Sequence, residues 1–158
     1  MTVAPDSAQL RVHGIPGAVA ALRAHGLRVS MARRVVLEAL FAAEGPATAD
    51  ELAAGIPGVV PESDLASVYR NLETLEQIGL VHHIHFGHGA GRYVLSARAE
   101  RGYVWCQCCG AIEPLSAGTQ AALRGVIVAQ TSYDARFTHF PVAGRCAGCR
   151  AGDGRSAA

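Results

Sequence analysis

Residues 106–149 begin with Cys106-Gln107-Cys108-Cys109-Gly110 and end with Cys146-Ala147-Gly148-Cys149. At each end, two cysteines are separated by two residues, a spacing at which one tight turn aims both sulfurs at the same ion. Two such turns supply four thiolate ligands at the corners of a tetrahedron and leave no position for water. The pattern therefore predicts a structural Zn²⁺ site that joins the two ends of this stretch, with the ligands Cys106, Cys109, Cys146 and Cys149.

Buried free thiols, a disulfide and an iron–sulfur centre are the alternatives to zinc at these cysteines. The N-terminal residues MTVAPDSAQLRV lack the basic start, apolar run and cleavage site of a secretory signal. We therefore expect a cytoplasmic protein, and disulfides are rare in that compartment. The fifth cysteine, Cys108, is either an incidental thiol or one that senses oxidants beside the metal.

The composition is that of a globular protein, because half of the 158 residues are apolar and can form a core. No apolar stretch is long enough to cross a membrane. The net charge is +1, divided into −2 for residues 1–95 and +3 for residues 96–158. This balance does not by itself indicate a nucleic-acid-binding protein. DNA binding would have to depend on the local placement of arginines.

The N-terminal half has the pattern of several helices in succession. They are expected at residues 9–24, 31–43, 48–54 and 63–79. Pro16 can shorten the first helix, so that it begins nearer to Pro16. Ser63 would cap the last of these helices. The opposite face of this helix is polar. Its apolar residues recur at intervals of three and four and are expected to face inward: Leu65, Val68, Leu72 and Leu75.

Two runs with strand-like composition follow these helices, at residues 80–86 and 92–95. The glycine-rich segment 87–91 separates them and favours a hairpin turn. A short helix, a turn, a longer helix and then a hairpin predict a winged helix-turn-helix domain over residues 1–95.

The C-terminal part has the pattern of a smaller α/β domain. A hinge is expected at residues 96–101, the domain at 102–150 and a disordered tail at 151–158. Strands are predicted at residues 103–106, 111–115 and 136–142, with a helix at 119–130. The predicted fold class is α+β, an N-terminal winged helix-turn-helix followed by a small α/β domain with a four-cysteine zinc site.

Four short motifs resemble those of the ferric uptake regulator (Fur) family: residues 26–34 (GLRVSMARR), 65–72 (LASVYRNL), 79–81 (GLV) and 106–110 (CQCCG). The resemblance covers nearly all of residues 17–150. It implies a homodimeric transcriptional regulator, usually a repressor controlled by a metal ion, with residues 102–150 as the dimerisation domain. The expected partners are a second copy of the chain and double-stranded DNA with a palindromic operator. The protein would not be an enzyme.

The resemblance assigns six residues to DNA contacts: Arg28, Arg33, Arg34, Ser67, Tyr69 and Arg70. Residues 65–72 would be the recognition helix, with Arg70 on a phosphate or a guanine edge and the other two on base edges or backbone. The three N-terminal arginines would contact phosphates. A solvated helix face is the alternative for Arg33 and Arg34, and partial burial against the second helix is the alternative for Tyr69.

The regulatory metal site of the family does not match this sequence. Members that sense a metal carry a His-x-His cluster before the first cysteine pair. The corresponding positions here are Arg101 and Tyr103, and neither suits zinc or ferrous iron. A second, regulatory metal would have to use other ligands, for which the candidates are His82, His83, His85, His88 and His139, with Glu113 a weaker one.

In the predicted wing, His83 and His85 share one face of a strand, and His88 could join them from the turn. The alternatives are histidines that lie against DNA or at the surface. A regulator that needs no metal, or one that responds to pH or an oxidant, also fits the sequence.

Two other functions compete with a DNA-binding regulator. A zinc-ribbon adaptor would use its winged helix to bind protein, and the negative charge of residues 1–95 slightly favours it. A thiol oxidoreductase would use Cys106, Cys108 and Cys109, but thiolates bound tightly to zinc cannot also cycle. The DNA-binding regulator with structural zinc is the leading hypothesis.

Overall fold

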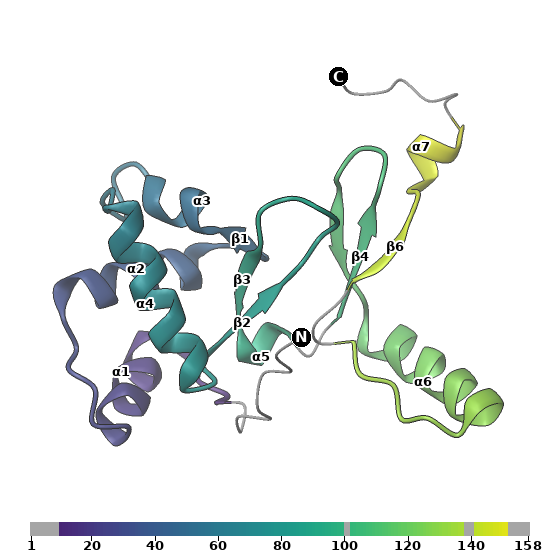
Figure 1. Cartoon of the computed structure of the whole chain (residues 1–158), viewed down its shortest axis with the longest axis horizontal. Helices are drawn as coiled ribbons and strands as arrows, with labels where there is room; N and C mark the ends of the chain where they lie inside the picture. Colours follow the sequence, from purple (N-terminus) through teal and green to yellow (C-terminus); the bar gives the residue numbers. More distant parts are fainter. Residues whose placement is uncertain (1–9, 100–101, 138–140, 152–158) are drawn as a thin grey trace. The chain divides into compact units, whose positions relative to one another are not determined.

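The computed structural model describes residues 10–99, 102–137 and 141–151, which belong to two compact units (Figure 1). The first unit consists of Met1–His83 and Ala90–Arg98, and the second of Ile84–Gly89 and Ala99–Ala158. Residues 84–89, which the sequence pattern places in the N-terminal domain, therefore group with the second unit. There the Phe86 ring packs edge-on against Tyr103, with ring centroids 6.2 Å apart.

The described part of the first unit consists of helices followed by a hairpin, in the predicted order. Its three-stranded sheet has the order β1-β3-β2, in which β1 and β3 are antiparallel. The elements are α1 (Gly14–Ala24), α2 (Met31–Ala42), β1 (Ala47–Thr48), α3 (Ala49–Ala54), α4 (Leu65–Gln77), β2 (Val81–Ile84), β3 (Arg92–Leu95) and α5 (Ser96–Ala99).

Side-chain caps determine where the helices of the first unit begin. The Ser30 hydroxyl accepts the backbone N–H of Arg33 at the start of α2. Thr48 and Glu51 form a reciprocal capping box on α3. Asp64 caps α4, one residue later than the predicted cap at residue 63. A carboxylate at this position also interacts favourably with the positive end of the helix dipole.

Helix α1 is shorter than the predicted range of 9–24, because it begins at Gly14. Pro16 lies in its first turn, where the backbone N–H has no helical partner and proline is well tolerated. Ser96–Ala99 of the predicted hinge is a short helix, and residues 100–101 lie outside the described part of the chain.

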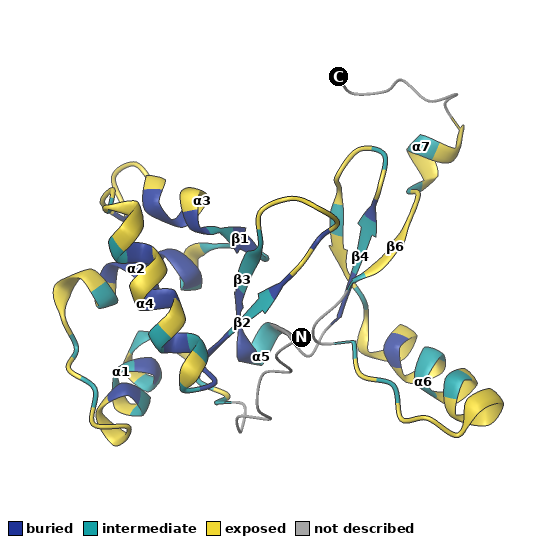
Figure 2. Cartoon of the chain, in the orientation of Figure 1, coloured by how far each residue is buried: buried dark blue, intermediate teal, exposed yellow. Residues whose placement is uncertain are grey.

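A hydrophobic core fills the first unit (Figure 2). Val68, Leu72 and Leu75 of α4 are fully buried, which confirms the inward-facing stripe predicted for this helix. Leu65 is an exception, because it begins the helix and remains 37% exposed. Other large buried side chains of the same core come from α1, α2 and the segment after α4, and they include Leu22, Leu37 and Leu80.

The second unit contains β4 (Tyr103–Cys106), β5 (Ile112–Pro114), α6 (Ala117–Thr131), β6 (Val142–Gly144) and α7 (Ala147–Ala151). In its sheet β4 is the central strand, antiparallel to β5 and parallel to β6. Figure 2 shows that α6 and β6 are largely exposed. In the described residues of both units, no helix is long and apolar enough to span a membrane.

The last strand does not lie where the sequence predicts it, at 136–142. Residues 136–137 are not in a strand, residues 138–140 lie outside the described part, and the strand is Val142–Gly144. Its position follows from the pairing of Gly144 with Cys106. The β propensity of the individual residues could not predict this pairing. Of the predicted tail, Ala151 ends α7 and residues 152–158 are outside the described part.

Gly55 generates a test of this fold. It follows α3 with φ +66° and ψ −161°, a backbone conformation that is essentially restricted to glycine. A Cβ atom there would lie 2.4 Å from the carbonyl oxygen of Val60. We expect Gly55→Ala to lower the free energy of unfolding by about 3 kcal/mol, as measured by urea unfolding.

The matched control is Gly26→Ala. Gly26 also has a positive φ, +70°, but an added Cβ would meet no described atom within 4 Å. Its substitution should lower the free energy of unfolding by only about 1 kcal/mol. Equal losses in the two variants would contradict the close approach at Gly55.

Candidate metal centre and nucleic-acid interface

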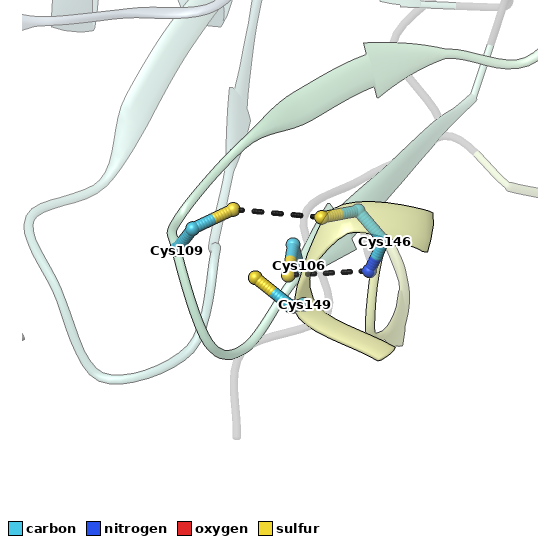
Figure 3. Close-up of side chains that lie close together, drawn as sticks. All are labelled: Cys106, Cys109, Cys146 and Cys149. Atoms are coloured by element: carbon cyan, nitrogen blue, oxygen red, sulfur yellow. Dashed lines mark hydrogen bonds between the residues drawn. The ribbon is translucent and has the colours of Figure 1, made fainter. Parts of the chain in front are cut away.

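The four predicted zinc ligands come together in the second unit. Cys106 ends β4, Cys109 lies in the turn after it, and Cys146 and Cys149 lie at the start of α7 and within it. Their sulfurs point toward one another (Figure 3) and lie within 4.8 Å of one another. The sulfurs of Cys109 and Cys146 are 3.8 Å apart. Four sulfurs about 2.3 Å from a zinc ion would lie about 3.8 Å apart at the corners of a tetrahedron.

Backbone hydrogen bonds bring the two cysteine pairs together. The N–H of Gln107 donates to the carbonyl oxygen of Gly144 at 2.8 Å, continuing the pairing of β4 with β6. The N–H of Cys146 donates to the Cys106 sulfur at 3.3 Å (Figure 3). Gly110 has φ +74° and closes the first turn by donating to the carbonyl oxygen of Cys106. These hydrogen bonds within the chain therefore bring the two predicted cysteine turns to one place.

The thiol pKa values indicate that this cluster suits a cation. Backbone N–H groups, of Cys109 first and then Cys146, lower the pKa of Cys106 to about 6. Hydrogen bonding with the neighbouring sulfurs, Cys108 first, raises the pKa of Cys149, because adjacent sulfurs do not readily share negative charge. A divalent cation removes that repulsion and favours four thiolates. The donor set is thus compatible with structural zinc.

All five cysteines lie in the described residues, and all are free thiols. A disulfide would need sulfurs about 2.05 Å apart, much closer than the 3.8 Å between Cys109 and Cys146. Cys108 is half-buried and is not one of the four clustered ligands. Its role as an incidental or oxidant-sensing thiol stays a prediction.

Helix α4 presents two of the predicted DNA-binding residues to solvent. Tyr69 is 44% exposed and Arg70 is exposed, whereas Ser67 is half-buried. The opposite side of the helix is fixed in the core by Val68 and Leu72. The exposed part of Tyr69 is available for contacts, and partial burial against the second helix stays an alternative for this residue.

The three predicted phosphate-binding arginines differ in their surroundings. Arg28 is exposed. Arg34 is also exposed and forms an ion pair with Glu38, with 3.0 Å between Nε and Oε1. Arg33 is half-buried, and its side chain donates to Asn71 at 3.1 Å and to the carbonyl oxygen of Arg28 at 2.7 Å.

Asn71 is a residue of this region that the sequence interpretation missed. It is only 8% exposed although it is polar, and it accepts the hydrogen bond from Arg33. The signal was present in the sequence, because Asn71 lies three residues after Val68 and four before Leu75, on the inward side of α4.

The structure does not assemble the predicted regulatory metal ligands. His83 stacks on Tyr93, with ring centroids 4.8 Å apart and an interplanar angle of 9°. His85 and His88 are exposed, and His82 is half-buried. Within the described ranges, the four cysteines are the one group of three or more His, Cys, Asp or Glu side chains close enough to share an ion.

The two remaining candidate ligands are Glu113 and His139. Glu113 is an exposed residue of β5. His139 lies outside the described residues. A regulatory metal at any of these positions therefore stays a prediction.

Comparison with known families decides the relationship of this chain. The sequence profile of the Ferric uptake regulator family matches residues 24–134, which is more than half of the chain. The chain belongs to the Fur family. The match spans both the predicted recognition helix and the first cysteine pair.

Individual relatives agree with this assignment. The peroxide-responsive repressor PerR of Staphylococcus saprophyticus is 29% identical over 100 residues, covering 63% of this chain and 67% of that protein. The Vibrio cholerae ferric uptake regulator structure matches with a TM-score of 0.64 and 27% identity, covering 82% of this chain and 99% of that one. The Helicobacter pylori ferric uptake regulator has a TM-score of 0.66 at 18% identity, covering 86% and 91%, so it shows the shared fold.

The metal centre can be tested with two cysteine variants. Cys146→Ser removes one of four clustered ligands, whereas Cys108→Ser changes a thiol outside the cluster. We expect metal analysis of the purified protein to find one zinc per chain in the wild type and in Cys108→Ser. Cys146→Ser should lose the zinc and the order of the second unit, measured by amide hydrogen exchange. A zinc-loaded, ordered Cys146→Ser protein would refute the assignment of the four cysteines as zinc ligands.

Proposed function

We propose that the protein is a homodimeric transcription regulator that binds double-stranded DNA sequence-specifically, acts as a repressor and holds a structural Zn²⁺ in each chain. The observation that carries the proposal is the asymmetry of α4. One side of this capped helix is fixed in the core, and Tyr69 and Arg70 are exposed on the other. In a helix-turn-helix, the second helix enters the major groove with such a face.

The charges on α4 favour recognition through its N-terminal half. Arg70 would contact a guanine edge or a phosphate, and Ser67 and Tyr69 would contact base edges or the backbone. Glu73 is exposed one turn further along and would be repelled by phosphates. Arg28 and Arg34 would supply phosphate contacts beside the helix, so binding would weaken as salt rises.

The second unit supports association with another copy of the chain. On α6, Ala122, Val126 and Ala129 recur at intervals of four and three residues, and all are exposed. Val126 is 62% exposed and Val128 is 47% exposed. An apolar stripe of this kind is stabilised when a second surface covers it. A two-fold dimer would bring two recognition helices to the half-sites of a palindromic operator.

A second, regulatory metal would use the wing histidines, if the family's form of control is retained. Among the described residues these histidines do not form a group of three or more potential ligands, so the wing would have to rearrange to hold an ion at three of them. Control without that metal, by an oxidant or by pH, is the alternative. Operator affinity measured with zinc, iron, manganese or nickel added to the zinc-loaded protein discriminates between these forms of regulation.

Arg70→Ala tests the DNA-binding part of the proposal. Loss of a guanine or phosphate contact should weaken operator binding by about 1–3 kcal/mol, which is roughly 5- to 150-fold, without loss of zinc. Fluorescence anisotropy with a duplex selected by the wild-type protein from a random library measures the affinity. Gln77→Ala, at the exposed C-terminal end of the same helix, is the control and should bind as the wild type does. Unchanged affinity of Arg70→Ala would contradict the recognition-helix assignment.

Val126→Glu tests the dimer. A carboxylate in the apolar stripe of α6 would be desolvated in an interface, so the dimer should be weaker and its dissociation constant should rise. Sedimentation equilibrium measures the dimer dissociation constant. Val59→Glu introduces the same charge at a 71% exposed valine of the first unit and should leave the constant unchanged. Equal behaviour of the two variants would argue against a dimer formed through α6.

A further inference from the structure

The Arg33 side chain connects three segments of the first unit. It projects from the first turn of α2, where its own backbone N–H is bound by the Ser30 cap. Its Nε donates to Oδ1 of Asn71 on α4 at 3.1 Å. One terminal nitrogen donates to the carbonyl oxygen of Arg28, before α2, at 2.7 Å. A single guanidinium thus links the segment before α2, α2 itself and α4.

Both polar atoms of the Asn71 side chain take part in this arrangement. Its Oδ1 accepts from Arg33, and its amide nitrogen donates to the carbonyl oxygen of Ser67 at 2.9 Å. Its side chain is nearly inaccessible, at 8% exposure, so it cannot reach a DNA duplex itself. The residue therefore fixes α4 from inside the protein, one turn from Ser67 and beside Arg70.

These contacts require an arginine for a geometric reason. The planar guanidinium presents several N–H donors in a rigid fork and can reach two acceptors in different directions at once. An ammonium group on the same stem carries the same charge but lacks the fork. Both acceptors here are neutral, an amide oxygen and a backbone carbonyl, so the contacts depend on the positions of the donors more than on charge.

We propose that Arg33 is a positioning residue for DNA recognition: by joining Asn71 to the Arg28 carbonyl, it fixes the exposed Arg28 relative to the recognition face of α4. Two groups that must meet one duplex together need a fixed separation. The inference rests on the proposed DNA-binding function and names a residue that sets its selectivity. Under this assignment Arg33 itself is not a phosphate contact.

A positioning role and a phosphate contact have different experimental signatures. A phosphate contact contributes equally to operator and unrelated DNA, and its loss reduces the salt dependence of binding by about one charge. A positioning residue affects mainly the selected sequence, because unrelated DNA is held by charge without a fixed register. The two roles therefore separate in a comparison of two duplexes over a range of salt.

The experiment uses the full, zinc-loaded chain and two duplexes: one selected by the wild type from a random library, and a scrambled duplex of the same composition. For Arg33→Lys, we expect at least a tenfold loss of affinity for the selected duplex. Affinity for the scrambled duplex should stay within twofold of the wild type. The slope of affinity against salt concentration should be unchanged. Arg23→Lys, at an exposed position of α1 with no assigned DNA contact, is the matched control and should change neither affinity.

Asn71→Ala removes the same link from the opposite side without altering any group that reaches DNA. It should reproduce the selective loss, and the double variant with Arg33→Lys should be no worse than either single variant. Circular dichroism and zinc content identify variants that fail to fold. If Asn71→Ala does fail, Asn71→Gln, which keeps an amide but displaces it, takes its place in the same comparison and should show the same selective loss.

Three results would overturn the assignment. Arg33→Lys could bind the selected duplex as tightly as the wild type, or the losses in Arg33→Lys and Asn71→Ala could be additive. Alternatively, Arg33→Gln could weaken both duplexes equally with a salt slope smaller by about one, the signature of a phosphate contact. If the wild type selects no duplex at all, the proposed function fails together with this inference, which distinguishes that failure from the other three.

Discussion

The meeting of four sulfurs is the constraint on which the second unit depends. Its described residues include few buried side chains: Ile84, Phe86, Tyr103, Cys106 and Gln120. Burial on this scale does not offset the entropy of ordering two knuckles and a three-stranded sheet. All three residues of β6 are exposed, so packing does not hold this strand against β4. A metal bound at Cys106 and Cys146 would contribute its binding free energy directly to the folding of this sheet.

The first unit is stabilised by a hydrophobic core, whereas the second would depend on its metal centre. Its core is one continuous hydrophobic cluster that extends from Ala18 of α1 to Leu95 of β3. Three leucines, Leu37, Leu72 and Leu75, fix α2 and α4 in this core. Because α4 is held in place by packing within the first unit, we expect the geometry of its exposed face not to require the zinc centre. Zinc would then stabilise the unit that carries the apolar stripe of α6, and the hydrophobic core would stabilise the helix that would meet DNA.

Sequence patterns predicted those parts of the molecule that depend on residues close together in the chain. The two-residue cysteine spacing indicated the metal cluster, and the three-and-four spacing in α4 indicated its buried side. The last strand was misplaced because its position depends on pairing with Cys106, from a distant part of the chain. The Arg33–Asn71 hydrogen bond joins residues 38 positions apart, so neither residue alone indicated it. A polar residue on an inward-facing stripe was the one available signal, and its partner could be found only in the folded chain.

Tyr103, at a position where the resemblance to the Fur family led us to expect a metal ligand, is a packed aromatic side chain. Tyr103 is 4% exposed and meets the ring of Phe86 edge-on. Close by in the same unit, a Cβ at Gly87 would lie 2.4 Å from Trp105, so the backbone of residues 84–89 approaches this ring closely. An ion at this place would have to displace two rings and would find a phenol instead of an imidazole. Aromatic packing thus occupies this position, and we expect any regulatory metal of this protein to use ligands elsewhere in the chain.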